Sequence, residues 1–293
     1  MLTARPGDFI DAALTAPHAF QADQWHQSSL TFTHHMPGVV RIQPDNPTVS
    51  RCVVLSSGIH GDETAPIELI DGLLADILSG AFTPTVPLLL IIGHAEAIKA
   101  HTRFLEDNLN RLFGGWNPEK NEEHYLANQL QQAVSTFLPA QPASMQRWHL
   151  DLHSAIRDSH HYMFGVIPTT PKATDVRPLA ALLNDANMDA TVLSQSPSPT
   201  FSWYSANTMM LWPRRWKWDA LHHCMKMICA NMRHLIRHYA PSLPRRRCFC
   251  TRTYAFLSGD AHLNQAHRAV CVVVPIIGEK LYPVSTRRVL SHG

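Results

Sequence analysis

The chain has 293 residues, 45% of them hydrophobic, and a formal net charge of +2 at pH 7. This length fits one large α/β domain or a domain with an appendage, and the apolar content is sufficient for a buried core. No apolar run approaches the roughly 18 residues of a membrane span, and Met1–Pro6 is not followed by the long apolar segment of a secretory signal. We therefore expect a cytoplasmic protein without a membrane partner.

Charge and cysteine are distributed unevenly along the chain. Residues 1–206 hold 11 Lys and Arg against 20 Asp and Glu, whereas residues 207–293 hold 14 against 3. The net charge therefore changes from −9 to +11, and five of the six cysteines lie in 207–293. Such a contrast is typical of a basic tail that binds nucleic acid or metal. It predicts two parts, 1–206 and 207–293.

Apolar patterns alternate between strand-like and helix-like along the first part. Residues 51–58 form a short apolar run that ends in glycine and predict a buried strand, and residues 65–77 have helical spacing with Pro66 in the first turn. The further elements expected in chain order are a strand at 86–93, helices at 95–101 and 122–138, and strands at 148–153 and 162–167. The alternation predicts an α/β fold with a largely parallel sheet.

Two histidines and a glutamate lie where ligands bind in such sheets, beyond the carboxyl ends of strands. His60 and Glu63 follow the first strand, and His153 ends the strand at 148–153. Two imidazoles and one carboxylate are the ligand set of a catalytic zinc site, which leaves a fourth position open for water. A lone His-x-x-Glu is usually a surface accident, and a lone strand histidine is usually a core residue. The three together favour a metal site, with Asp151 placed to orient His153.

Polar residues that can recognise a substrate follow the second strand. Arg111 can make a bidentate contact with a carboxylate, Asn110 can donate an amide hydrogen bond, and Arg103 adds a second positive charge. The alternative interpretation is a solvated basic loop.

Three motifs together resemble the succinylglutamate desuccinylase/aspartoacylase family: residues 58–66, 108–113 and 151–157, within a resemblance that covers roughly 45–206. The resemblance implies a zinc-carboxypeptidase-like fold, with a mixed, largely parallel sheet flanked by helices. It implies hydrolysis of N-succinyl-L-glutamate to succinate and L-glutamate in arginine catabolism. His60, Glu63 and His153 would hold one Zn²⁺. Arg103, Asn110 and Arg111 would hold the small-molecule substrate.

The general base of the family is absent at its expected place. The resemblance implies a glutamate in a Thr-Leu-Glu-Leu/Met-Gly-Arg/Lys segment shortly after a Thr-Phe-Ser/Thr stretch. Thr200-Phe201-Ser202 matches that stretch, but the next glutamate is Glu279, roughly sixty residues too late. No residue is therefore assigned as the catalytic base, and the activity of this chain is in doubt.

The codons after Ala206 restore the missing segment when they are read one base earlier. The last base of Trp216 with the first two of Lys217 must encode glutamate, and Trp218 with Asp219 must encode glycine. The surrounding shifted triplets permit Ala-Ala/Thr-Thr-Leu before the glutamate and Met-Gly-Arg after it. Our hypothesis is that residues 207–293 are an out-of-frame tail that lies outside the family and is poorly ordered, although residues 272–277 can add a chance strand.

Two other functions remain as alternatives. One is an aspartoacylase-like deacylase that acts on another N-acyl amino acid, such as N-acetylaspartate, because arginines recognise carboxylates generally. The other is an inactive zinc-binding or nucleic-acid-binding protein that uses the basic tail. Nucleic acid is the less favoured partner, since an out-of-frame tail has no selected surface.

Overall fold

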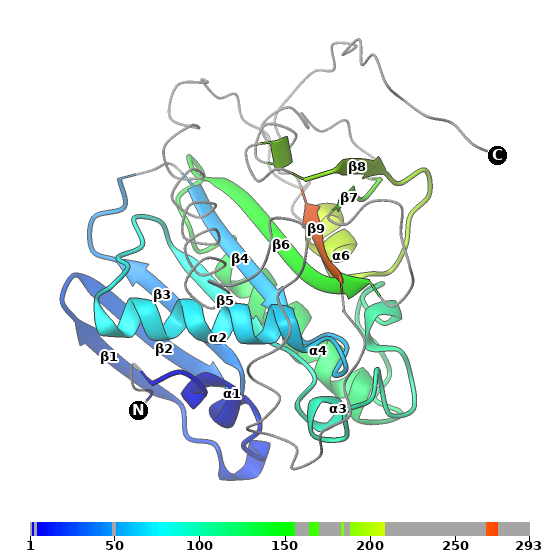
Figure 1. Cartoon of the computed structure of the whole chain (residues 1–293), viewed down its shortest axis with the longest axis horizontal. Helices are drawn as coiled ribbons and strands as arrows, with labels where there is room; N and C mark the ends of the chain where they lie inside the picture. The colour runs from blue at the N-terminus through cyan, green and yellow to red at the C-terminus, as the bar shows by residue number, and fades with distance from the viewer. Residues whose placement is uncertain are drawn as a thin grey trace, which may run out of the picture.

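Figure 1 shows a computed structural model of the chain. The structure describes residues 2, 5–48, 51–155, 164–169, 183–184, 188–208 and 268–274. Our expectations for residues 209–267 and 275–293, Glu279 included, lie outside the described residues. No helix in the described part combines the length and the apolar content needed to cross a bilayer.

The described elements form one mixed sheet with helices on both faces. The strands are β1 (Asp23–Gln27), β2 (Leu30–Met36), β3 (Val39–Pro44), β4 (Arg51–Ser57), β5 (Leu88–Ile92), β6 (Gln146–Ala155), β7 (Phe164–Ile167), β8 (Ala190–Leu193) and β9 (Arg268–Val274). The helices are α1 (Asp8–Ala13), α2 (Thr64–Ser79), α3 (Ala95–Lys99), α4 (Glu122–Phe137) and α6 (Phe201–Thr208), with short 3-10 turns η1 (Pro17–Ala19) and η2 (Leu109–Arg111).

The centre of the sheet matches the expected α/β arrangement, and the fold class is confirmed. The strand order is β1-β2-β3-β5-β4-β6-β9-β7-β8. β4 pairs in parallel with both β5 and β6, and in the second pairing Ser56 lies opposite Asp151. Because the carboxyl ends of parallel neighbours meet at one edge, this pairing brings the segments that follow β4 and β6 together.

Antiparallel strands extend the sheet on both sides of its parallel centre. β1, β2 and β3 form an antiparallel meander whose last strand pairs antiparallel with β5. On the other side β9 pairs antiparallel with β6 and parallel with β7. β9 overlaps the expected chance strand and ends at Val274, just before a proline that has no N–H to donate to a ladder.

Two apolar clusters hold the layers together, one on each face of the sheet. Val53 and Leu55 of β4 pack in the cluster that contains residues of α1 and α2, whereas Cys52 and Val54 pack in the cluster with α4 and Phe201. Successive side chains of a strand point to opposite faces, which explains the division. The same alternation places Ser56, two residues after Val54, on the face of α4 and α6.

The buried carboxylate of Asp71 on α2 fixes α1 to α2. It accepts hydrogen bonds from the backbone nitrogens of Gly7 (2.6 Å), Phe9 (3.2 Å) and Ile10 (3.2 Å), donors at the start of α1 that the helix itself cannot satisfy. We expect Asp71→Ala to lower the free energy of unfolding by about 1–3 kcal/mol, since it leaves these donors unpaired. Urea denaturation measures the change, and Asp76→Ala, at a half-buried position of the same helix, is the control.

Candidate metal centre

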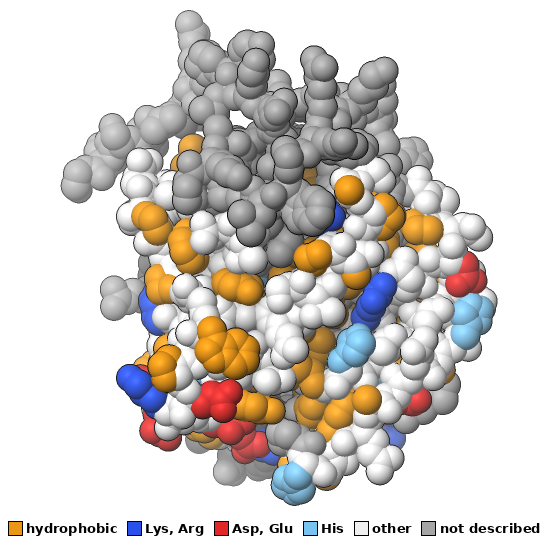
Figure 2. All heavy atoms as spheres, turned by 180° about the vertical axis from the view of Figure 1, so that it is seen from behind, with side chains coloured by type: hydrophobic (Ala, Val, Ile, Leu, Met, Phe, Trp, Pro, Cys, Tyr) orange, Lys and Arg blue, Asp and Glu red, His pale blue; other side chains and the backbone are white. Residues whose placement is uncertain are grey.

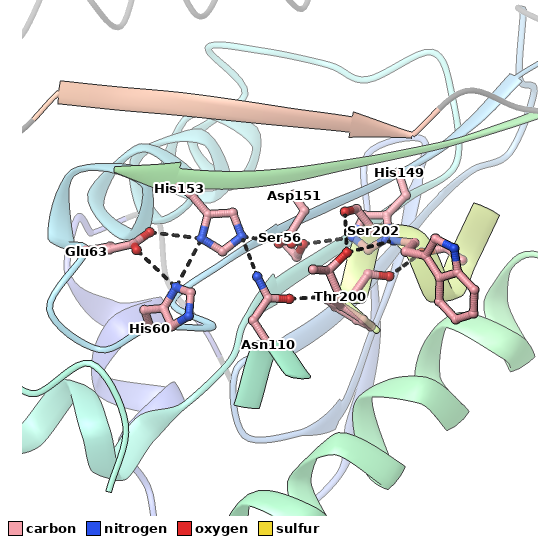
Figure 3. A network of polar contacts seen from close by, with 12 residues as sticks. Ser56, His60, Glu63, Asn110, His149, Asp151, His153, Thr200 and Ser202 are labelled. Carbon is pink, nitrogen blue, oxygen red and sulfur yellow. Dashed lines mark hydrogen bonds and ion pairs between the residues drawn. The ribbon is translucent and has the colours of Figure 1, made fainter. Parts of the chain in front are cut away.

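His60, Glu63 and His153 meet at the edge of the sheet where β4 and β6 end (Figure 3). His60 follows β4 by three residues, Glu63 immediately precedes α2, and His153 lies near the end of β6. All three side chains are buried, and each offers one ligand atom within 4.8 Å of the others. The topology therefore brings together the three residues that the sequence singled out.

The separations between these atoms suit a metal ion of the size of zinc. His60 Nδ1 lies 3.0 Å from Glu63 Oε1, His153 Nδ1 lies 2.9 Å from Glu63 Oε2, and the two Nδ1 atoms are 3.3 Å apart. Ligands about 2.0–2.2 Å from a tetrahedral zinc lie roughly 3.3–3.6 Å from one another. The three residues can thus share one such ion after shifts of roughly a few tenths of an ångström.

Asn108 fixes which nitrogen of His60 is available to a metal. Its Oδ1 accepts from the backbone nitrogen of Asn110 (3.0 Å), so this atom is the amide oxygen. The same Oδ1 lies 3.1 Å from His60 Nε2, which must therefore donate. With its proton on Nε2, His60 presents a lone pair on Nδ1 to the site.

Asp151 has the same effect on His153. Its Oδ2 lies 2.9 Å from His153 Nε2, and a carboxylate only accepts, so Nε2 carries the proton and Nδ1 faces Glu63. Burial lowers the pKa of His153, but Asp151 and Glu63 outweigh burial and raise it to about 10. The expected role of Asp151 in orienting His153 agrees with this geometry. A metal ion on Nδ1 would take the place of a proton, so metal binding would be coupled to proton release.

Glu63 is held in its charged form by several donors. Its Oε2 accepts from the backbone nitrogen of Ser154 (2.8 Å), and its Oε1 accepts from Arg103 Nη1 (2.6 Å). Burial raises the pKa of this carboxyl, but the adjacent imidazoles of His153 and His60 hold it well below its usual range. The carboxylate is therefore ionised over the whole physiological range, as a metal ligand must be.

Gly61 allows the turn between the two ligands to pack closely on α3. A Cβ at this position would lie 2.1 Å from the carbonyl carbon and 2.4 Å from the oxygen of Ala97, both backbone atoms. We expect Gly61→Ala to displace His60 or Glu63 and to weaken metal affinity by about 10-fold or more, measured by chelator competition. Gly114→Ala is the control, because its Cβ would make only an ordinary contact, 3.6 Å from Pro199.

Residues 50–211, more than half of the chain, match the succinylglutamate desuccinylase/aspartoacylase catalytic domain. The chain belongs to this family. A succinylglutamate desuccinylase of Vibrio vulnificus is 46% identical over 173 residues, which are 59% of this chain and 50% of the relative. One of Yersinia enterocolitica is 41% identical and covers 58% of this chain and 51% of the relative.

Solved structures of the family have the same fold. The succinylglutamate desuccinylase of Vibrio parahaemolyticus superposes with a TM-score of 0.63 at 41% identity, covering 68% of each chain. That of Vibrio cholerae has a TM-score of 0.64 at 34% identity and covers 81% of this chain and 72% of its own. The present chain spans about half the length of the curated relatives it matches.

The residues that the family resemblance assigned to substrate take different positions around the metal centre. Arg103 is partly exposed and contacts Glu63. Arg111 is exposed and donates from Nη1 to the backbone oxygen of Asn110 (2.7 Å). Asn110 is buried, and its Oδ1 accepts from the backbone nitrogen of Phe201 (2.9 Å). The structure thus brings Arg103 and Asn110 to the centre, whereas Arg111 contacts the backbone of Asn110.

The loop that carries Arg103 is held by Glu123 and His94, two residues for which the sequence predicted no role. Glu123 of α4 is buried and accepts through Oε1 from the backbone nitrogens of Leu105 (2.9 Å) and Glu106 (3.0 Å). The same oxygen pairs with His94 Nε2 at 3.2 Å. Burial raises the pKa of Glu123, but these donors lower it overall. An ionised Glu123 therefore ties this loop to α4.

Proposed function

We propose that this chain carries the zinc centre of an amidohydrolase that cleaves N-succinyl-L-glutamate to succinate and L-glutamate in the cytoplasm. The observation that carries the proposal is the geometry of His60, Glu63 and His153. Their ligand atoms lie nearly as close together as two ligands of one tetrahedral zinc ion. Membership of the family and relatives named succinylglutamate desuccinylase support the substrate.

His60, Glu63 and His153 would hold one Zn²⁺, which would polarise the scissile carbonyl and lower the pKa of a bound water. Ionised Glu63, with His60 and His153 protonated on Nε2, supplies the ligand set. Asp151 and Asn108 hold those protons in place, and Ser154 holds the carboxylate of Glu63.

The substrate contacts that we propose use groups at the edge of the centre. A guanidinium has five N–H donors, so Arg103 and Arg111 each retain donors for a substrate carboxylate beyond those already engaged. Asn110 Nδ2 lies 3.4 Å from His153 Nε2, which donates to Asp151. Because His153 Nε2 is a donor here, it cannot accept from Asn110, and the Nδ2–H groups of Asn110 are available to a substrate oxygen.

We further propose that residues 207–293 are read out of frame and that the general base is lost with them. The present chain should then bind zinc but hydrolyse its substrate slowly. The test of the substrate is to compare hydrolysis of N-succinyl-L-glutamate and N-acetyl-L-aspartate by a chain with the frame restored. Faster hydrolysis of the first supports the proposal, and a preference for the second favours the aspartoacylase-like alternative.

The alternative of a nucleic-acid-binding protein has little support in the described residues. On the face seen in Figure 2, their Lys and Arg side chains lie scattered among apolar and acidic ones and form no continuous basic surface. Salt-dependent binding of duplex or single-stranded nucleic acid by the full chain would support this alternative.

A further inference from the structure

A buried chain of hydrogen bonds links His153 to helix α6, which packs on the same face of the sheet (Figure 3). Asp151, which accepts from His153, also accepts through Oδ1 from Ser56 Oγ at 2.6 Å. Ser56 Oγ lies 2.8 Å from His149 Nε2, and His149 Nδ1 contacts Ser205 Oγ on α6. The link therefore runs from Asp151 of β6 to Ser56 of β4, returns to His149 of β6 and ends at Ser205 of α6.

Simple chemistry fixes the direction of each bond in this link. The carboxylate of Asp151 only accepts, so the single hydroxyl proton of Ser56 points at Asp151. Ser56 must then accept from His149 Nε2, which carries a proton. Burial lowers the pKa of His149 to about 4, so the ring is neutral near pH 7 and its Nδ1 can only accept. Ser205 Oγ, which also lies 2.9 Å from the backbone oxygen of Phe201, therefore shares its single proton between this nitrogen and that carbonyl oxygen. The protons of His149 and Ser56 thus both point toward Asp151.

The burial of the link makes each bond consequential. Ser56 and Asp151 are 0% exposed, His149 is 1% exposed and Ser205 is 2% exposed. Removing one member leaves a buried partner unpaired. The same geometry excludes Ser56 as a nucleophile, because its oxygen is enclosed and its proton is committed to Asp151.

Helix α6 contacts the metal centre at a second point as well. Phe201, its first residue, donates from its backbone nitrogen to Asn110 Oδ1, and its ring packs edge-on against His149 with centroids 4.7 Å apart. The docking of α6 therefore fixes both His149 and Asn110.

We propose that Ser56, His149 and Ser205 are positioning residues for the metal centre. They hold Asp151 so that His153 keeps its proton on Nε2 and presents Nδ1 to the ion, which couples the docking of α6 to metal affinity. This proposal rests on the proposed zinc-hydrolase function.

The test compares two serine variants of the same strand in the full chain. Ser56→Ala removes the hydroxyl that links His149 to Asp151. Ser57→Ala removes a buried hydroxyl that has no hydrogen-bond partner in the described structure. Competition with a chromophoric chelator should show zinc affinity reduced about 10–100-fold in Ser56→Ala and unchanged in Ser57→Ala. Equal affinity in both variants overturns the proposal.

A second variant and a second measurement separate positioning from general stability. Ser205→Ala acts from α6 and should also weaken zinc binding; it carries the test if Ser56→Ala does not fold. Long-range ¹H–¹⁵N spectra of the zinc-loaded chain report which nitrogen of His153 is protonated, and we expect a loss of the Nε2–H population in both variants. The alternative outcome is that the variants have lower melting temperatures while their zinc affinity and the His153 spectrum stay unchanged. In that case these serines act only on stability, which overturns the proposal.

The outcomes for the two proposals are distinct. A wild-type chain that binds no zinc contradicts both the proposed function and the positioning role. A wild-type chain that binds zinc, together with Ser56→Ala and Ser205→Ala variants that bind it equally well, contradicts the positioning role alone.

Discussion

His60→Ala is expected to remove tightly bound zinc from the chain. The wild type should bind one ion per chain, because three ligand atoms converge on one point. The variant retains only Glu63 and His153, and loss of a direct ligand should exceed the ~10–100-fold cost of losing a group that merely supports a ligand. Elemental analysis after gel filtration measures the stoichiometry, and chelator competition measures the affinity.

The stability of the same variant gives an independent readout. Zinc at 100 times its dissociation constant should raise the free energy of unfolding of the wild type by about 2.7 kcal/mol, whereas the same concentration should leave His60→Ala unaffected. The matched control is His26→Ala, which removes an exposed histidine paired with Asp45 and should keep full zinc binding. Stoichiometric zinc in His60→Ala would rule out the three-residue site.

The metal centre could be predicted from the sequence because two of its ligands lie at the ends of predicted strands. The apolar run before Gly58 and the one before His153 each predict a buried strand, and alternating helices predict that these strands are parallel. Parallel neighbours end at the same edge, so His60 and His153 had to converge. The fold class and the convergence of these ligands follow from local patterns of this kind.

The polar link behind the centre depends on register, which no local pattern specifies. His149, Asp151 and His153 alternate along one strand, a readable sign that they share a face. That Ser56 lies opposite Asp151 follows from the pairing of β4 with β6, over a sequence separation of 95 residues. The partner of Arg103 was unpredictable for a similar reason, since the path of its loop is set by Glu123 of α4.

Restoring the reading frame after Ala206 is expected to raise the hydrolysis of N-succinyl-L-glutamate by about 10²–10⁴-fold, the usual contribution of a general base. The coding DNA across residues 206–219 comes first, since the hypothesis requires that the shifted frame stays open. A shifted frame closed by early stop codons contradicts it at once. Zinc affinity should change little, because His60, Glu63 and His153 precede the junction.

A glutamate encoded across codons 216 and 217 would lie within reach of the site. It follows Thr208, the last residue of α6, by about nine residues, a tether that spans up to roughly 30 Å when extended. Helix α6 contacts the centre through Phe201 and Asn110, so a tether of this length would be long enough to return to it. The matched control replaces this glutamate with glutamine in the restored chain. If the glutamate is the base, the replacement returns activity to the level of the present chain while zinc stays bound; a restored chain that is equally active with glutamine must take its base from elsewhere.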